Sequence, residues 1–93
     1  MRAISKTKQF RKDQKREKRG EHKDSLEHDL VELVTLLAGD ETLPDRYQDH
    51  GLSGEWKDFR EAHLHPDLIL IYRKVGNDSL ELVRLGSHSE LGL

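Results

Sequence analysis

The chain contains no cysteine, few aromatic residues and no long apolar run. Without cysteine, no disulfide can reinforce the fold. Hydrophobic residues make up 33% and charged residues 37% of the 93 positions, so we expect a single domain over residues 1–93 with a thin core. No apolar run approaches the roughly 20 residues that cross a bilayer, and the N-terminus shows no apolar leader pattern. These absences predict a soluble, cytoplasmic protein without a membrane partner.

Positive charge is scarce after residue 25 and concentrated before it. Residues 1–24 hold ten lysines and arginines against four aspartates and glutamates, whereas residues 25–93 hold six against fourteen. A basic segment such as KQFRKDQKREKRG attracts polyanions, and its binding to nucleic acid weakens as salt rises. The alternative is a solvated helix face without a partner. Because the rest of the chain is acidic, we expect any contact with RNA to be localised.

Two helices are expected in the N-terminal half, after a short first strand in RAIS. Residues 6–19 are rich in helix formers, with Phe10 as the only large apolar residue. A second helix is expected to open at Asp24, because Glu27 three residues later gives the spacing of a capping box. Gly39 ends it. Its apolar stripe consists of Leu26, Leu30, Leu33, Val34 and Leu37.

Three strands are expected from Trp56 onward, in EWKDFREAHL, LILIYRKV and SLELVRLGSH. The GND segment, residues 76–78, has hairpin turn chemistry, and HPD is a tight connection, so both favour antiparallel pairing. Four consecutive apolar residues, 68–71, predict a central strand covered on both faces. The predicted fold class is α+β, with two N-terminal helices packed on a small antiparallel sheet.

The segment HLHPD, residues 63–67, raises the possibility of a metal site. Residues two apart in a strand share a face, so His63, His65 and Asp67 are expected to point the same way if the extended conformation persists to the turn. Imidazole and carboxylate suit zinc or another divalent ion. This set lacks a longer ligand spacing and contains a proline, so the sequence favours a site without metal. We expect His65 to be a solvated residue at the edge of a turn.

A second polar cluster lies at the end of the last strand. The same alternation puts Arg84, Gly86 and His88 on one face, where the glycine leaves room between guanidinium and imidazole. His50 lies in the glycine-bounded loop YQDHGLSG. Cleavage of RNA by its own 2′-hydroxyl needs a base, an acid and a cation at phosphorus. Histidine suits both proton-transfer roles, because its ordinary pKa is about 6.5.

Several of these residues also have a purely structural interpretation. On a strand, Arg84 can form a weak surface ion pair with Glu61 or Glu81. We expect Trp56 and Phe59 to anchor the core of an aromatic-poor chain, with base stacking as the less favoured alternative. Taken alone, the spacing leaves these interpretations open.

Residues 43–92 resemble the YafQ branch of the RelE superfamily, toxins of bacterial type II toxin-antitoxin systems. The motifs DH.L.G.W...R..H..PD.ILIY and R.GSH..L occur in order at the family's spacing, whereas the N-terminal half matches only in its helix arrangement. The resemblance implies a RelE-like microbial ribonuclease-type fold. It also implies a ribosome-dependent endoribonuclease, an mRNA interferase, that cuts messenger RNA at the decoding site without metal or cofactor.

The resemblance assigns roles to residues of this chain. Its catalytic positions fall on His50, His63, Asp67, Arg84 and His88. Arg84 is the phosphate-binding member, and His50 and His88 are the expected base and acid, in either order. His65 matches no catalytic position. We expect contact with RNA and the ribosome at Lys12, Lys15, Arg16, Arg19 and Arg60.

The resemblance also implies partners and an alternative. The partners are a cognate antitoxin, the 70S ribosome with its 16S ribosomal RNA, messenger RNA, and operator DNA only through the antitoxin. Where the family usually has aromatic residues, this chain has Leu68 and Gly92, a difference that bears on base stacking. The alternative function is therefore a catalytically degenerate toxin homologue, which binds the antitoxin and acts as a co-repressor without cutting RNA.

Overall fold

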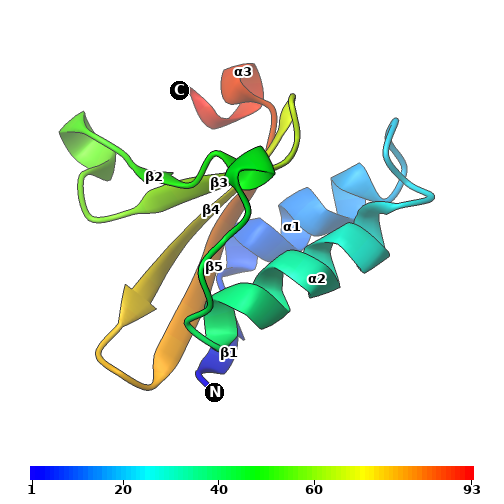
Figure 1. Cartoon of the computed structure of the whole chain (residues 1–93). Coiled ribbons are helices and arrows are strands. Elements are labelled where there is room, and N and C mark those ends of the chain that lie inside the picture. The colour runs from blue at the N-terminus through cyan, green and yellow to red at the C-terminus, as the bar shows by residue number, and fades with distance from the viewer.

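The apolar segment of residues 68–75 forms the central strand of a five-stranded sheet in the computed structural model, which describes residues 1–93. Leu68–Val75 (β4) pairs antiparallel with Arg60–His65 (β3) and with Ser79–Gly86 (β5). Ala3–Lys6 (β1) and His50–Gly51 (β2) form the edges, in the order β1-β5-β4-β3-β2 (Figure 1).

Both faces of β4 are covered, which confirms the prediction from its consecutive apolar residues. Leu68 and Leu70 belong to the main core, whereas Ile69 and Ile71 belong to a second apolar cluster. Each of the four is at most 1% exposed. The second cluster is completed by Leu91 and by partly buried neighbours that include Trp56 and Phe59, the predicted core anchors.

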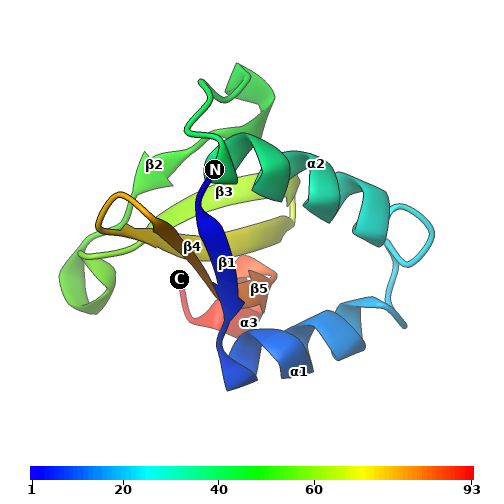
Figure 2. The same ribbon diagram turned by 90° about the horizontal axis from the view of Figure 1, so that it is seen from below.

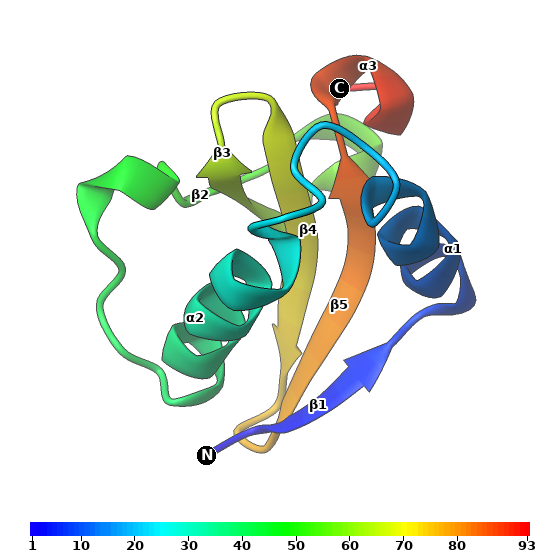
Figure 3. The same cartoon turned by 90° about the vertical axis from the view of Figure 1, so that its right-hand side faces the viewer.

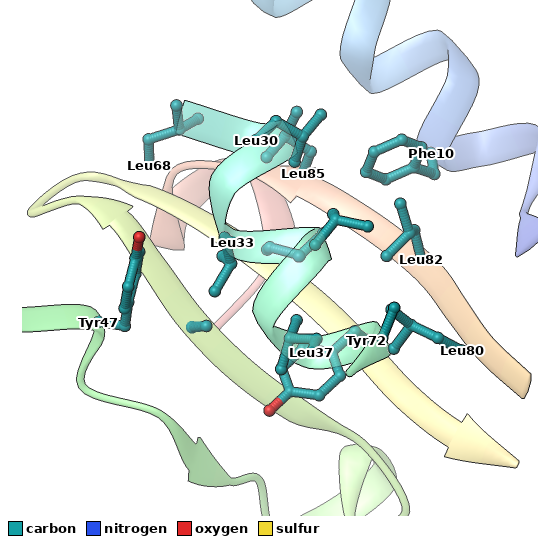
Figure 4. Packing of buried hydrophobic residues seen from close by; sticks show 14 of the residues in the cluster. Phe10, Leu30, Leu33, Leu37, Tyr47, Leu68, Tyr72, Leu80, Leu82 and Leu85 are labelled. Carbon is teal, nitrogen blue, oxygen red and sulfur yellow. The ribbon is translucent and has the colours of Figure 1, made fainter. Parts of the chain in front are cut away.

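Two helices cover one face of the sheet. They are Lys8–Glu17 (α1) and Leu26–Ala38 (α2), which lie on the same side of it in Figures 1 and 3. The predicted stripe of α2 is buried against the sheet, and Figure 4 shows Leu33 and Leu37 of α2 among the core side chains of the strands. From α1 the main core receives Phe10 alone. The predicted α+β class is therefore confirmed.

The start of α2 differs from the prediction. Residues 21–25 form turns, Ser25 precedes the helix, and no side chain caps it. The N–H of Leu26 instead donates to the carbonyl of His22 at 2.9 Å, so the preceding turn satisfies a backbone group that Asp24 was expected to serve. The predicted Asp24–Glu27 capping box is wrong. The chain forms such a box at Ser87 and Glu90.

One edge of the sheet is parallel. β1 runs beside β5 in parallel from Ala3, opposite Ser79, to Lys6, opposite Leu82, whereas the prediction gave a wholly antiparallel sheet. In Figure 2, β1 runs between α1 and α2 at this edge. Thr7 then begins α1, and its side chain accepts a hydrogen bond from the N–H of Phe10.

The remaining elements are short and connect or follow the strands. His88–Leu91 (α3) follows β5 and lies near the β3–β4 turn (Figures 1 and 3). Its first turn lines one cleft together with the α1–α2 connection. The helical turns Asp45–Tyr47 (η1) and Gly54–Trp56 (η2) flank β2. None of the helices has both the length and the apolar character needed to cross a membrane.

The buried stripe of α2 should dominate its contribution to stability. Leu33 is 0% exposed, whereas Val31 on the same helix is 58% exposed. We expect Leu33→Ala to lower the free energy of unfolding by about 2–5 kcal/mol, because it removes buried methyl groups and leaves a cavity. Val31→Ala should change it by no more than about 0.5 kcal/mol. Denaturant unfolding of both variants tests this, and equal losses would contradict the packing of α2.

Candidate active site

Polar side chains share the sheet face opposite α1 and α2. Directly opposed residues on neighbouring strands project to the same face. One row across the strands consists of His50, Glu61, Ile71 and Arg84, and the next consists of His63, Ile69 and Gly86. Because Ile69 and Ile71 lie outside the helix-covered core, both rows occupy the other face. The predicted site residues on strands are thereby aligned.

Glu61 is the centre of a histidine cluster. It is 4% exposed. The Nε2 atoms of His50 and His63 lie 2.7 and 3.5 Å from its Oε1, and the Nε2 of His88 lies 3.7 Å from its Oε2. These histidines come from β2, β3 and the start of α3. The structure thus brings together three predicted site histidines around a carboxylate.

The interior of this cluster holds polar atoms without hydrogen bonds. His63 is 8% exposed, and neither its Nδ1 nor its Nε2 has a hydrogen-bond partner within the chain. The Oε2 of Glu61 also lacks one. The His63 ring lies 5.5 Å, between ring centroids, from that of His88. Unsatisfied buried polar atoms are costly and uncommon, so this arrangement indicates a site kept for a substrate or an ion.

His50 is held from both sides of its ring. Its Nδ1 lies 2.7 Å from the carbonyl oxygen of Gln48, while its Nε2 faces Glu61. Both neighbours are hydrogen-bond acceptors, so a ring N–H on either side of the imidazole finds a partner. Gln48 has a left-handed backbone, with φ of 47°, which turns its carbonyl back toward the ring.

A buried tyrosine supports the loop that carries His50. The Tyr72 hydroxyl donates a hydrogen bond to Asp49, and Asp49 also accepts from Arg60 Nε and Nη2 at 3.3 and 3.2 Å. Burial, and then the bond to Asp49, raise the pKa of the Tyr72 hydroxyl well above its ordinary value. Tyr72 therefore stays a neutral donor that fixes the residue preceding His50.

Sequence reasoning missed the central position of Glu61 among the histidines. It treated this residue only as an ion-pair partner for Arg84, yet Glu61 precedes His63 by two positions on a strand and must share its face. That signal was present in the sequence. The missing information was the pairing of β2 with β3 and the return of α3, which place His50 and His88 beside the carboxylate.

The predicted common face of His63, His65 and Asp67 is wrong. The strand register shifts between His63 and His65, so His65 turns toward the helices. There its Nε2 lies 2.8 Å from an oxygen of Asp29, and its ring stacks on that of His22 with centroids 4.1 Å apart. His63 and His65 are therefore separated by the sheet and cannot act as one ligand pair.

Asp67 lies apart from the histidine cluster. It is exposed on the turn between β3 and β4 and forms no hydrogen bond or ion pair within the chain. It lines a polar cleft whose walls include Arg16, His22 and Ser87. Ser87 and Glu90 also line this cleft, so Asp67 shares it with the start of α3 and not with Glu61.

Gly86 does make room, but for an arginine other than the predicted one. A Cβ on Gly86 would lie 2.7 Å from Nη2 of Arg16. Arg84, the expected phosphate-binding residue, forms its ion pair with Asp13 of α1 at 2.8 Å. The predicted ion pair of Arg84 with Glu61 or Glu81 is therefore wrong, because Arg84 pairs with the N-terminal helix instead.

Comparison with known proteins identifies the family of this site. The family model for YafQ, a bacterial toxin of type II toxin-antitoxin systems, matches residues 2–92. The chain belongs to the YafQ family. This confirms the resemblance found in the motifs of residues 43–92, and it extends the match through the N-terminal helices.

Two relatives show the range of the similarity. The mRNA interferase toxin YafQ of Escherichia coli strain B / BL21-DE3 is 43% identical over 84 residues, which cover 89% of this chain and 87% of that protein. A YafQ toxin of Haemophilus influenzae is 48% identical over 54 residues, so this second match spans about half of each protein, 55% and 53%.

Solved structures of the family share the fold. A copper-bound mutant toxin from Helicobacter pylori superposes with a TM-score of 0.83 at 40% identity, covering 98% of this chain and 99% of that one. The toxin in the E. coli DinJ-YafQ complex has a TM-score of 0.78 at 37% identity, with 98% of each chain covered. The predicted RelE-like toxin fold is confirmed by these likenesses.

The basic surface of this YafQ-family chain is only partly free. Lys12, Lys15 and Arg19 are exposed and form no ion pair or side-chain hydrogen bond. Arg16 is also exposed, yet its guanidinium contacts Asp13, Glu17, Glu90 and the carbonyl of Leu85. Arg60 pairs with Asp49. The expected contacts with RNA therefore fall into two groups. Lys12 and Lys15 on α1, with Arg19 just beyond its end, are free, whereas Arg16 and Arg60 are already engaged in ion pairs.

Proposed function

We propose that this YafQ-family chain is a ribosome-dependent endoribonuclease toxin, a single domain over residues 1–93 that cleaves messenger RNA at the decoding site. The observation that carries the proposal is the convergence of His50, His63 and His88 on buried Glu61. Arg84 lies in the same row, two strands away, at a backbone separation of about 10 Å. Proton-transfer groups and a fixed cation on one face meet the needs of phosphodiester cleavage.

The proposed reaction uses the substrate's own hydroxyl. One histidine accepts the proton of the 2′-hydroxyl, and the 2′-oxygen then forms a bond to phosphorus. The bond from phosphorus to the 5′-oxygen breaks as a second histidine donates a proton to that oxygen. The products are a 2′,3′-cyclic phosphate and a 5′-hydroxyl. No covalent enzyme intermediate and no metal ion are needed for these steps.

Exposure separates the roles of the histidines. The side chains of His50 and His88 are 54% and 46% exposed, whereas that of His63 is 9% exposed. We therefore assign His50 and His88 to the base and acid, because only accessible rings can contact RNA. His63 positions these two histidines through Glu61. Asp67, on its exposed turn, tunes them.

Base recognition should rest little on stacking at the two unusual positions. Leu68 is 1% exposed within the main core, and Gly92 has a φ of 72° that a side chain would strain. Neither position presents a ring to a base. The degenerate toxin homologue is the alternative function, and the complete histidine set favours the enzyme.

A cognate antitoxin is the second proposed partner. The E. coli relative forms a DinJ-YafQ complex, and this chain belongs to the same family of toxin-antitoxin toxins. We infer that an antitoxin covers the face with Glu61 and thereby blocks access of RNA, and that operator DNA is contacted only through the antitoxin. Because the proposed action is on the 70S ribosome, we also propose a cytoplasmic location.

Loss of an exposed imidazole at the site should abolish toxicity. We expect regulated expression of the wild type in a bacterium to arrest growth and produce in-frame mRNA cuts, and His88→Ala to lower the cleavage rate by about 10²–10⁴-fold. His65→Ala is the matched control, because this histidine bonds to Asp29 on the other side of the sheet. It should cut at close to the wild-type rate.

The chemistry is tested on the mapped cut site. A programmed ribosome carrying mRNA with a 2′-deoxynucleotide at that position should yield no product, because the attacking hydroxyl is missing. Cutting of the deoxy message would refute 2′-hydroxyl attack. If the wild type binds an antitoxin but cuts no messenger RNA, the alternative function of a degenerate toxin homologue would be correct instead.

The free cations on α1 and just after its end should provide much of the ribosome affinity. We expect replacement of Lys12, Lys15 and Arg19 by glutamine to weaken binding and lower the slope of log affinity against log salt by about one per lost phosphate contact. A control triple with the same charge change, at Arg46, Lys57 and Lys74, lies outside this helix. Filter-binding assays at several salt concentrations measure the affinity of both triple variants. An unchanged slope for the variant at Lys12, Lys15 and Arg19 would contradict their assignment to ribosome binding.

Binding of a transition metal is a second candidate function. One ligand atom from each of Glu61, His63 and His88 lies within 4.8 Å of the others, and the buried atoms without hydrogen bonds belong to two of these residues. Imidazole and carboxylate are suitable ligands for copper or zinc. The copper-bound toxin of Helicobacter pylori supports this candidate. When bound, the ion would withdraw these imidazoles from proton transfer.

Metal binding should therefore oppose cleavage. We expect calorimetry to show Zn²⁺ or Cu²⁺ binding that Glu61→Gln weakens at least about tenfold, because a carboxylate ligand is lost. His28→Ala is the control, since this exposed histidine lies on α2. The ion should also slow RNA cleavage, and a chelator should restore it. Metal affinity equal in Glu61→Gln and the wild type would contradict this site.

A further inference from the structure

A buried carboxylate lies within the basic N-terminal helix. Asp13 is 0% exposed, although aspartate is rarely buried fully without compensation. It accepts hydrogen bonds from Gln9 Nε2 at 3.3 Å, Arg16 Nη1 at 3.0 Å and the N–H of Leu85 at 3.0 Å. It also accepts from Arg84 Nε at 2.8 Å and Nη2 at 3.3 Å. Two of the four donor residues, Arg84 and Leu85, belong to β5, so Asp13 is a junction between α1 and β5.

Part of this junction completes the sheet. The pairing of β1 with β5 stops at Lys6 opposite Leu82, so the backbone of Leu85 has no neighbouring strand on that side. Asp13 accepts from the N–H of Leu85, and Arg16 donates to its carbonyl at 2.7 Å. Side chains of α1 thus replace a missing strand at the edge of β5.

The edge alone does not account for the contacts with Arg84. Asp13 takes two nitrogens of this guanidinium, which fixes its plane, since a forked pair defines direction as well as distance. Nη1 of Arg84 forms no hydrogen bond within the chain, and the side chain is 22% exposed. Arg84 projects from the row that contains Glu61. Two nitrogens of the guanidinium are therefore anchored to Asp13, and Nη1 is left without a partner in the chain.

The carboxylate of Asp13 is ionised beside Arg84. Burial by itself raises the pKa of Asp13, but the hydrogen bonds from Arg84, from the N–H of Leu85 and from Gln9 outweigh it and hold the pKa below its ordinary value. An anion is therefore present beside Arg84 across the neutral range, where a neutral carboxyl group would orient it less strongly.

We propose that Asp13 is a positioning residue of the nuclease site, which acts by fixing the Arg84 guanidinium so that its free N–H groups meet the scissile phosphate. The inference rests on the proposed function, in which Arg84 stabilises charge at phosphorus. A donor held in place before the reaction stabilises developing charge without reorganising, so its contribution is made in the transition state. Asp13 therefore influences turnover more than binding.

A double-mutant cycle tests the proposal on ribosomes programmed with the mapped message. We expect Asp13→Asn to lower kcat by about ten- to a hundredfold with KM nearly unchanged, because a misplaced cation stabilises the transition state less. Arg84→Ala should lower kcat further. In the Arg84→Ala background, Asp13→Asn should add less than about a twofold loss, since its effect passes through the missing guanidinium.

A matched carboxylate separates positioning from general stability. Asp40 also lies between two cations, Arg2 at 2.9 Å and Lys74 at 2.7 Å, but at the other end of the strands. Asp40→Asn should keep the wild-type kcat even where thermal unfolding shows a loss of stability. If Asp13→Asn does not fold, Asp13→Glu replaces it in the cycle. This variant keeps the charge and should retain more activity than any neutral variant that folds.

The outcomes distinguish this inference from the function on which it rests. Multiplicative losses in the cycle, or an Asp13→Asn enzyme with wild-type kcat beside a weakened Arg84→Ala enzyme, would overturn the positioning role and leave the nuclease intact. Wild-type cleavage by Arg84→Ala would overturn the role of Arg84 and this inference together. In the wild type, the Nε–H of Arg84 should exchange slowly with solvent by NMR, and fast exchange would contradict the anchored geometry.

Discussion

The ionised carboxylate of Asp13 is the interaction on which the two halves of the molecule depend. It lies on a basic helix that contributes only Phe10 to the main core, so apolar packing alone holds that helix weakly. Its hydrogen bonds to Arg84 and Leu85 connect the helix to the strand that leads into His88. Because a buried charge without donors is costly, α1 and β5 must keep this geometry together.

The second buried carboxylate, Glu61, has the opposite character. Asp13 is surrounded by donors, whereas one oxygen of Glu61 and both nitrogens of His63 have none. The sheet thus holds one satisfied anion at its edge and one incompletely satisfied polar cluster on the face opposite the two long helices. The first provides rigidity, and the second has capacity left for a substrate or an ion. A central strand buried on both faces separates them, with Ile71 between Glu61 and Arg84.

Local patterns in the chain predicted much of this arrangement. The apolar run of residues 68–71 predicted a doubly covered strand, and alternation placed His63 on the correct row because β3 is regular up to that residue. The prediction failed at His65, where a register shift reverses the side chain, and at Asp24, where a preceding turn makes a side-chain cap unnecessary. Both failures depend on backbone irregularities that residue spacing does not encode.

By itself, the sequence determined the α+β class, the main elements and the family, since amphipathic periodicity and the ordered motifs of residues 43–92 are local properties. Tertiary structure alone decided which charges meet. It made Glu61 the centre of the histidines, took Arg16 out of the free basic surface and gave Arg84 to Asp13. These contacts join residues up to 71 positions apart. Only the pairing of strands and the packing of α1 against the edge of β5 bring them within hydrogen-bond distance.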